Sequence, residues 1–319
     1  MTRIYFAPME GVTDYVFRRV HHRHFSGVDK YFIPFLSPTH SLTFSTRERN
    51  DVIPQNNAGV PTVPQVLTNN AEYFLSVADW LQDLGYTEIN LNLGCPSGTV
   101  TAKKKGSGLL RYPDMFRTLL DEVYAHSPLP VSIKTRIGYE SPEEWAGLVS
   151  IYIQYPIHEM IIHPRTRTEF YNGIPHPEYC RDLPFPFIYN GDLFTAEDCR
   201  ALLKDLPRAA GIMLGRGLVA NPALAQQYSG GVALTRESLL SFHDDLYREY
   251  LESWPATAAV GKMHLLMKYF SSSFENGDKV LRILRKATTC DEYEDAVYPL
   301  FREQPFRSDP SFRLDLLLS

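Results

Sequence analysis

Short runs of hydrophobic residues, rich in β-branched and aromatic side chains, recur along the chain, and each ends in polar residues or glycine. Eight such runs occupy residues 4–9, 30–35, 61–67, 88–94, 131–138, 159–166, 186–192 and 211–217. Amphipathic stretches such as 71–84 and 113–125 separate most of them, whereas 36–60 has the composition of a long, turn-rich excursion. Alternating strands and helices are typical of parallel strands with helical crossovers. Eight units predict an α/β fold of the (β/α)8 TIM barrel type.

The strand pattern stops near residue 235. Helical spacing then dominates in four segments, 236–252, 258–275, 278–286 and 291–302. The paired glycines at 230–231 suit a linker. We therefore expect a TIM-barrel catalytic domain over residues 1–231 and a small, all-helical domain over residues 232–319.

The composition indicates an ordinary globular protein, with 44% hydrophobic and 22% charged residues among 319. No apolar run approaches the roughly 18 residues of a membrane helix, and the N-terminus reads as a strand rather than a signal peptide. We expect a cytoplasmic protein without membrane contact, and a monomer, since nothing indicates an obligate assembly.

The four cysteines form no CxxC pair, so neither a metal site nor a disulfide framework is expected. The net charge of −5 argues against a nucleic-acid partner unless basic residues cluster locally.

Polar residues two positions apart occur near the ends of four predicted strands. These pairs are Asn90 and Asn92, Lys134 and Arg136, His163 and Arg165, and Asn190 and Asp192. Side chains two apart on a strand share a face, and an outward polar residue would meet apolar helices. A single such residue is more often solvated or locally paired, but four strands in register favour a site inside the barrel mouth.

Two glycine-containing turns follow the seventh and eighth predicted strands, Asn190-Gly191-Asp192 and Gly215-Arg216-Gly217. TIM barrels commonly hold a phosphate between these two loops. Glycine lets backbone N–H groups approach an anion, and Arg216 could add a charge-assisted contact. Each motif alone fits an ordinary turn, but together they indicate a cofactor that carries a phosphate.

Cys95 lies on a turn at the end of the fourth predicted strand, between Gly94 and Pro96. A cysteine at a barrel mouth can donate a proton or act as a nucleophile. Without further context, a structural thiol is the commoner role.

With these residues assembled, the sequence resembles the bacterial tRNA-dihydrouridine synthase family. Val100, Gly106, Leu109, Leu110 and Pro113 keep the family's spacing, and Lys268-Tyr269 in the helical tail is less specific. The principal matching motifs are Ala7-Pro8-Met9-Glu10-Gly11-Val12-Thr13-Asp14, Gln65, Asn92-Leu93-Gly94-Cys95-Pro96, Lys134-Thr135-Arg136, His163-Pro164-Arg165-Thr166 followed by Tyr171, and the two glycine turns.

The resemblance implies FMN as the tightly bound cofactor, NADPH as the reductant and tRNA as the substrate, with the helical domain binding tRNA. Hydride would pass from flavin N5 to uracil C6, Cys95 would protonate C5, and Asn92 would orient the base. The residues implied to bind the cofactor are Pro8, Met9, Glu10, Gln65, Lys134, His163, Asn190, Gly191, Asp192, Gly215 and Arg216.

The positions expected to contact tRNA are basic, apart from Asn92. They are Lys103, Lys104, Lys105, Arg136, Arg165, Arg167, Arg282, Arg285 and Lys286, and each cluster could equally be a solvated surface. The chain also departs from the family at several positions. Asn90 replaces an acidic residue, Ile33-Pro34 replaces a Thr-Glu pair, His-Pro-Arg-Thr replaces His-Gly-Arg-Thr, and Lys103–Lys105 replaces a glycine-rich stretch. These changes leave the implied flavin site intact but leave the uridine position open.

Two alternatives remain at this point. One is an FMN barrel oxidoreductase that reduces a small pyrimidine or enone, which the acidic net charge favours. The other is an RNA-binding protein that has lost catalysis, which the retention of Cys95, Lys134 and the phosphate turns disfavours.

Overall fold

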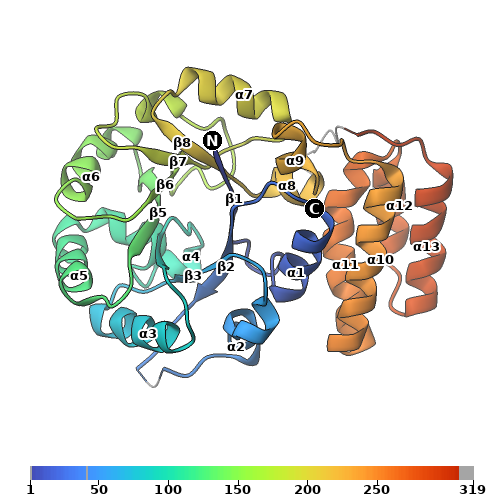
Figure 1. Cartoon of the computed structure of the whole chain (residues 1–319), viewed down its shortest axis with the longest axis horizontal. Coiled ribbons are helices and arrows are strands. Elements are labelled where there is room, and N and C mark those ends of the chain that lie inside the picture. The colour runs from blue at the N-terminus through green and yellow to red at the C-terminus, as the bar shows by residue number, and fades with distance from the viewer. Residues whose placement is uncertain (1, 41, 309–319) are drawn as a thin grey trace. The chain divides into compact units, whose positions relative to one another are not determined.

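The computed structural model describes residues 2–40 and 42–308, and within them eight parallel strands close into a barrel in sequence order (Figure 1). The predicted TIM barrel is therefore confirmed. All eight predicted runs contain a strand, although the seventh is short. The strands are β1 (Arg3–Phe6), β2 (Lys30–Leu36), β3 (Thr62–Val66), β4 (Ile89–Leu93), β5 (Val131–Gly138), β6 (Met160–Thr166), β7 (Phe187–Tyr189) and β8 (Ala209–Leu214).

The helices between the strands begin where local capping allows. Helix α3 (Ala71–Asp83) starts after Asn70, whose side chain accepts a hydrogen bond from the backbone N–H of Tyr73 at 2.9 Å. Helix α5 (Pro113–His126) has proline in its first turn, where no intrahelical N–H bond is lost. The others are α2 (Thr46–Val52), inside the expected excursion, α4 (Gly98–Thr101), α6 (Trp145–Tyr152) and α7 (Ala196–Asp205).

The barrel interior has chemically distinct layers. Lys30, Glu88 and Glu159 form a charged cluster near the N-terminal ends of the strands, and Lys30 Nζ lies 2.6 Å from Glu88 and 3.4 Å from Glu159. An apolar layer follows, formed by Tyr5, Ala7, Phe32, Val63, Ile161, Ile188 and Met213. Polar side chains occupy the opposite end. Because TIM-barrel sites lie at the C-terminal ends of the strands, the candidate site has a packed apolar floor.

The chain separates into two compact units. The first comprises residues 1–10, 29–192 and 202–213, and the second comprises 11–28, 193–201 and 214–319. The second unit thus contains more of the chain than the predicted helical domain 232–319, and that boundary stays a prediction. The helices lying wholly in the second unit are α1 (Tyr15–His24), α8 (Arg216–Ala220), α9 (Leu224–Tyr228), α10 (Arg236–Ser253), α11 (Ala256–Phe270), α12 (Gly277–Leu284) and α13 (Cys290–Glu303).

A buried ion pair supports the second unit. Lys262 Nζ lies 2.6 Å from Asp14 and donates to the carbonyls of Gly11 and Val12, both at 2.7 Å. The Tyr250 hydroxyl donates to Asp14 at 2.9 Å. These contacts give the Gly-Val-Thr-Asp motif a structural role, because they tie it to α10 and α11.

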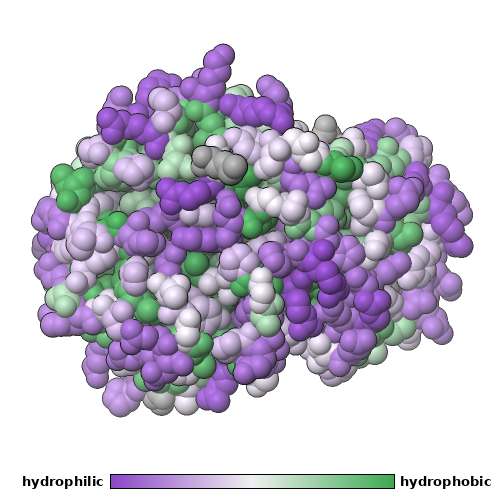
Figure 2. All heavy atoms as spheres, in the orientation of Figure 1, coloured by the Kyte–Doolittle hydropathy of each residue, from purple (hydrophilic) through white to green (hydrophobic). Residues whose placement is uncertain are grey.

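The visible surface is mostly hydrophilic, with hydrophobic side chains in small scattered groups (Figure 2). Within residues 2–40 and 42–308, no helix combines the length and the apolar character needed to cross a membrane.

Candidate active site

The Cys95 turn is built by hydrogen bonds from its own strand. Asn92 Oδ1 accepts from the backbone N–H groups of Gly94 at 3.0 Å and Cys95 at 2.9 Å. The Cys95 carbonyl accepts from the backbone and the hydroxyl of Ser107, at 3.1 and 2.8 Å. Both sides of the residue are therefore fixed, which holds the thiol at the end of β4.

Gly106 allows the following segment to return beneath this turn. Its φ is +56°, in the left-handed region that favours glycine. A Cβ at this position would meet the Cys95 carbonyl oxygen at 2.8 Å. A larger residue would displace the Cys95 turn, so the glycine is required by the geometry.

A chain of side-chain hydrogen bonds crosses the barrel beside Cys95. Asn92 Nδ2 donates to Gln65 Oε1 at 2.7 Å, and Gln65 Nε2 donates to Asn90 Oδ1 at 2.7 Å. Asn90 Nδ2 continues to Ser132 at 2.9 Å, and Ser132 donates to Glu88 at 2.6 Å. Asn90, which departs from the acidic family residue, is fully buried and bonds neighbours in the barrel. Gln65 keeps one N–H and one lone pair for a further partner.

The side chain of Lys134 has no counterion among the described residues. The backbone of Lys134 pairs in register with Asn92 on β4, but its Nζ forms no hydrogen bond or ion pair with any residue in the described parts of the chain. Burial, together with the nearby charge of Arg136, lowers the pKa of Lys134 to about 7. An anionic group bound here would restore its charge.

The Cys95 thiol is partly exposed. Burial raises its pKa, while the backbone N–H of Ser97 and the charges of Arg136 and Lys134 act in the opposite direction. The net effect favours the neutral thiol near pH 7, the form that can donate a proton.

Two arginines predicted to contact tRNA, Arg136 and Arg165, are buried among the described residues. Arg136 is 1% exposed, and it donates to the carbonyls of Gly94 at 3.0 Å and Thr166 at 2.7 Å. Arg165 is 0% exposed and forms a 2.5 Å ion pair with Asp192. Both guanidinium groups donate to internal acceptors at the strand ends, but Arg136 Nη2 and Arg165 Nε find no hydrogen-bond partner among the described residues. A positioning role is therefore visible for both arginines, and their contact with RNA stays a prediction.

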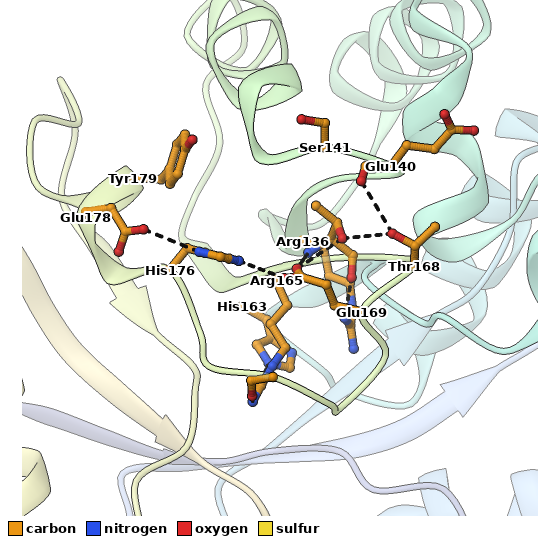
Figure 3. A network of polar contacts seen from close by, with 12 residues as sticks. Arg136, Glu140, Ser141, His163, Arg165, Thr168, Glu169, His176, Glu178 and Tyr179 are labelled. Carbon is orange, nitrogen blue, oxygen red and sulfur yellow. Dashed lines mark hydrogen bonds and ion pairs between the residues drawn. The ribbon is translucent and has the colours of Figure 1, made fainter.

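The loop after β6 is fixed at its base by an ionic network (Figure 3). His176 lies between Glu169 at 2.7 Å and Glu178 at 3.3 Å. Glu169 also accepts from the Thr166 backbone N–H at 2.6 Å, and Arg165 donates to the Gly173 carbonyl at 2.7 Å. The hydrogen bond to Glu169 raises the pKa of His176.

The remaining predicted cofactor residues of the first unit lie at strand ends. Pro8 and Met9 are partly exposed after β1, and Glu10 forms an ion pair with Arg47 of α2. His163 is buried, its Nε2 accepts a 3.1 Å hydrogen bond from Arg165 Nη1, and its ring lies beside the Tyr171 ring. Pro34, at the position of the family's acidic residue, is buried within β2.

The two predicted phosphate turns are each ordered by local contacts. Asn190 Nδ2 donates to the Met213 carbonyl at 2.8 Å, and a side chain at Gly191 would collide with the Tyr189 ring. Gly215 precedes α8, and the Arg216 guanidinium lies 6.0 Å from the Phe194 ring centroid. The turns belong to different compact units, and their phosphate contacts stay predictions.

The predicted exposed cations fall into two groups. Lys103 and Lys104 are exposed after α4, and burial lowers the pKa of the adjacent, half-buried Lys105. Arg282, Arg285 and Lys286 are exposed on α12 and directly after it. The sequence did not single out three residues that lie near the first group, Arg111, Tyr139 and Phe170. The available signal was their position in the segments that follow the predicted strands 88–94, 131–138 and 159–166.

The family model for dihydrouridine synthase matches residues 5–288. The chain belongs to the dihydrouridine synthase family. It is 27% identical over 308 residues to the tRNA-dihydrouridine(16) synthase of Pseudomonas syringae pv. tomato, which covers 91% of this chain and 96% of that protein. It is 29% identical to a probable tRNA-dihydrouridine synthase of Rhodobacter capsulatus, over 98% of this chain and 93% of that protein.

The solved structure of morphinone reductase is similar in fold. It has a TM-score of 0.50 and 13% sequence identity, and the match covers 73% of this chain and 87% of that chain. At this identity, the similarity supports the barrel and nothing further.

Proposed function

We propose that this protein reduces uridine in tRNA to 5,6-dihydrouridine, using FMN and NADPH. Family membership and the names of the relatives support the reaction and the substrate. The observation that carries the proposal is the placement of Cys95, a fixed and largely neutral thiol, close to the unpaired Lys134.

The residues of the first unit fit FMN. Lys134 lacks an anionic partner, and Gln65 retains hydrogen-bonding capacity toward the barrel mouth. Pro8 and Met9 offer half-exposed surface for a ring system. We propose that these residues and His163 hold the isoalloxazine and ribityl groups, with Glu10 at the rim. The contacts of Asn190, Gly191, Asp192, Gly215 and Arg216 with the phosphate remain part of this proposal.

FMN, when bound and reduced by NADPH, supplies a hydride to C6 of the uracil ring. Cys95 donates its thiol proton to C5 and is protonated again from solvent, so that two electrons and two hydrogens enter the C5–C6 bond. Asn92 holds the backbone of Cys95, which fixes the direction of this proton transfer. Lys134 would be protonated when the cofactor is bound, and its ammonium group would balance the negative charge of the cofactor.

The target uridine must leave its stack to enter the barrel mouth. We propose that Lys103, Lys104, Lys105 and Arg167 contact the RNA backbone near this mouth. The exposed Arg282, Arg285 and Lys286 of the C-terminal helices supply a second set of phosphate contacts. Local clusters of this kind reconcile RNA binding with the net charge of −5.

The first test is the visible absorption spectrum of the purified protein during anaerobic addition of NADPH and then of tRNA lacking dihydrouridine. We expect oxidised-flavin bands that bleach with NADPH and return only with tRNA. Bands that bleach and return with free uridine or a small enone would replace the tRNA proposal by a small-molecule reductase. A protein that binds no flavin even after reconstitution would refute the enzymatic proposal.

A further inference from the structure

Alternating cationic and aromatic side chains follow the C-terminal ends of β4, β5 and β6. The guanidinium groups of Arg111 and Arg167 lie 5.2 and 5.5 Å from the centroid of the Tyr139 ring. Arg167 also lies 4.9 Å from the centroid of Phe170. We call these four residues the arginine–aromatic ladder. Three separate loops contribute to it, so it is a feature of the fold and not of one segment.

The ladder is connected to the Cys95 loop. Arg167 Nη2 donates to Thr101 Oγ1 at 3.2 Å, and Thr101 ends the helix α4 that follows Cys95. On the same loop, Lys104 lies 4.5 Å from the centroid of the Tyr112 ring. A strand of RNA whose uridine reaches Cys95 would therefore pass this group of side chains.

The local charge is positive on balance. Arg111 and Arg167 of the ladder lie on the same group of loops as Lys103, Lys104 and Lys105. The nearby carboxylates are Glu140, 3.3 Å from Arg111, Glu144, which accepts from the Tyr139 backbone, and Glu169, which accepts from the Thr166 backbone. Both members of the Arg111–Glu140 pair are more than half exposed, so its strength in water is small. On a chain with net charge −5, this concentration of cations matches a polyanion.

Space and exposed ring surface are also present. Arg111 and Tyr139 lie at the edge of a depression of about 480 Å³, whose other lining residues belong mainly to α5 and α6. Phe170 is 37% exposed, in the same loop as the exposed Tyr171 and Ile174. Aromatic rings and arginine planes are the groups on which unpaired bases stack.

We propose that the arginine–aromatic ladder binds an unpaired nucleotide next to the target uridine, by stacking its base on Tyr139 or Phe170 and holding its phosphates with Arg111, Arg167 and Lys104. The proposal rests on the proposed reaction. Extrusion of one uridine removes a stacking partner from its neighbour, and the ladder replaces that partner. It also gives this acidic protein an RNA contact that combines charge with ring surface.

The test compares Tyr139→Leu and Phe170→Leu with the wild-type holoenzyme in steady-state turnover of tRNA lacking dihydrouridine. We expect each variant to raise KM for tRNA about tenfold, from loss of one base stack. The value of kcat, the FMN content and the rate of flavin reduction by NADPH should stay unchanged. Tyr139→Phe, which keeps the ring, should restore the wild-type KM.

Two matched controls lie at the opposite ends of the strands. Tyr155 precedes β6 and pairs with Tyr124 at 5.6 Å, and Arg208 is exposed directly before β8. Tyr155→Leu and Arg208→Gln should keep KM for tRNA within about twofold. Arg111→Gln and Arg167→Gln should each reduce the slope of log KM against log salt by about 0.7, whereas Tyr139→Leu should leave that slope unchanged.

An unchanged KM in Tyr139→Leu and Phe170→Leu would overturn the ladder as an RNA site, as would a lower unfolding temperature with normal KM. If Tyr139→Leu fails to fold, Phe170→Leu alone decides the test, because Phe170 is exposed and its replacement does not disturb the core. Failure of the proposed reaction is distinguishable, since the wild-type flavin would then bleach with NADPH and ignore tRNA.

Discussion

The pKa values of Cys95 and Lys134 are shifted by the same cause, burial, in opposite directions because one group is anionic and the other cationic when charged. Burial disfavours the charged form of each, which raises the pKa of the thiol and lowers that of the ammonium to about 7. Near neutral pH, the thiol holds a proton to give, and the lysine gains charge when an anion arrives. The register that pairs Asn92 with Lys134 joins the two groups, because Asn92 also holds the Cys95 backbone.

Replacement of Cys95 by alanine tests the proton donor. We expect Cys95→Ala to lower kcat for tRNA by roughly 10² to 10⁴, the usual contribution of a general acid. FMN content and flavin reduction by NADPH should be unchanged, because the thiol acts after those steps. Cys290→Ser, at another partly exposed cysteine, is the control and should retain full turnover. Full activity in Cys95→Ala would remove the thiol from the mechanism.

Lys134→Met tests the unpaired cation. In flavin-free protein we expect the variant to be more stable by on the order of 2 kcal/mol near pH 7, since it removes a charge that burial disfavours. The folded pKa of Lys134 is lowered to about 7, so between that value and about 10.5 the unfolded chain binds more protons. Wild-type stability should therefore rise with pH across this window, and the variant should lose that slope.

The measurement is the thermal midpoint of the flavin-free protein between pH 7 and 9, together with FMN affinity. The variant should bind FMN more weakly, although its fold is more stable. A variant with unchanged stability and unchanged FMN affinity would show that Lys134 lies outside the cofactor site.

At the scale of elements, the sequence predicted what depends on local pattern. All eight strand runs and the main C-terminal helices follow from hydrophobic spacing. Lys134 and Arg136 lie two positions apart within β5, as the alternation predicted. The partners of these residues depend on neighbouring strands. The ion pair of Arg165 with Asp192 could not be predicted from β6 alone, and Tyr139 became informative only when two arginines from other loops met its ring.

The loop after β6 should respond to pH through His176. The hydrogen bond to Glu169 raises the pKa of His176 above its ordinary value. The His176–Glu169 ion pair is therefore fully formed below about pH 6.5, and it is lost as the pH rises through the raised pKa of the folded protein. We expect hydrogen-exchange protection of residues 169–176, corrected for intrinsic rates, to fall roughly two- to fivefold between pH 6 and 8.5. His176→Gln should abolish this dependence.

His126→Gln is the matched control for that experiment, because His126 is exposed on α5 and pairs with Glu122 at 3.7 Å. It should leave the loop's pH response intact. If His176→Gln behaves like this control, the Glu169–His176 link does not order the loop.

Across the whole barrel, stability and chemistry occupy opposite ends of one interior. The charged cluster near the strand N-termini joins β2 to the residues that lead into β4 and β6, and Glu159 also contacts Arg3 and Tyr5 of β1. The apolar layer lies between this cluster and Lys134 and His163, while one hydrogen-bond chain, from Glu88 through Ser132 and Asn90 to Gln65, connects the two ends. Loops at the C-terminal ends can therefore vary without disturbing the contacts that close the barrel.

Glu159→Gln tests this separation. The Glu159 side chain is 5% exposed, whereas Arg3 is half exposed and Lys30 keeps its 2.6 Å contact with Glu88. We therefore expect a loss of about 2 kcal/mol of unfolding free energy, less than for a fully buried pair. The thermal midpoint should fall by roughly 4 to 8 °C. Glu143→Gln, at an exposed carboxylate, should change the midpoint little.

At a temperature where the Glu159→Gln variant remains folded, its FMN content and its KM for tRNA should equal those of the wild type, because the substitution lies beyond the apolar layer. A variant that keeps its thermal midpoint but loses flavin would contradict this division, since it would couple the charged cluster to the cofactor site. A fall in stability without loss of flavin would show that the two ends of the barrel are energetically independent, so that the RNA-contacting loops can change while the barrel stays closed.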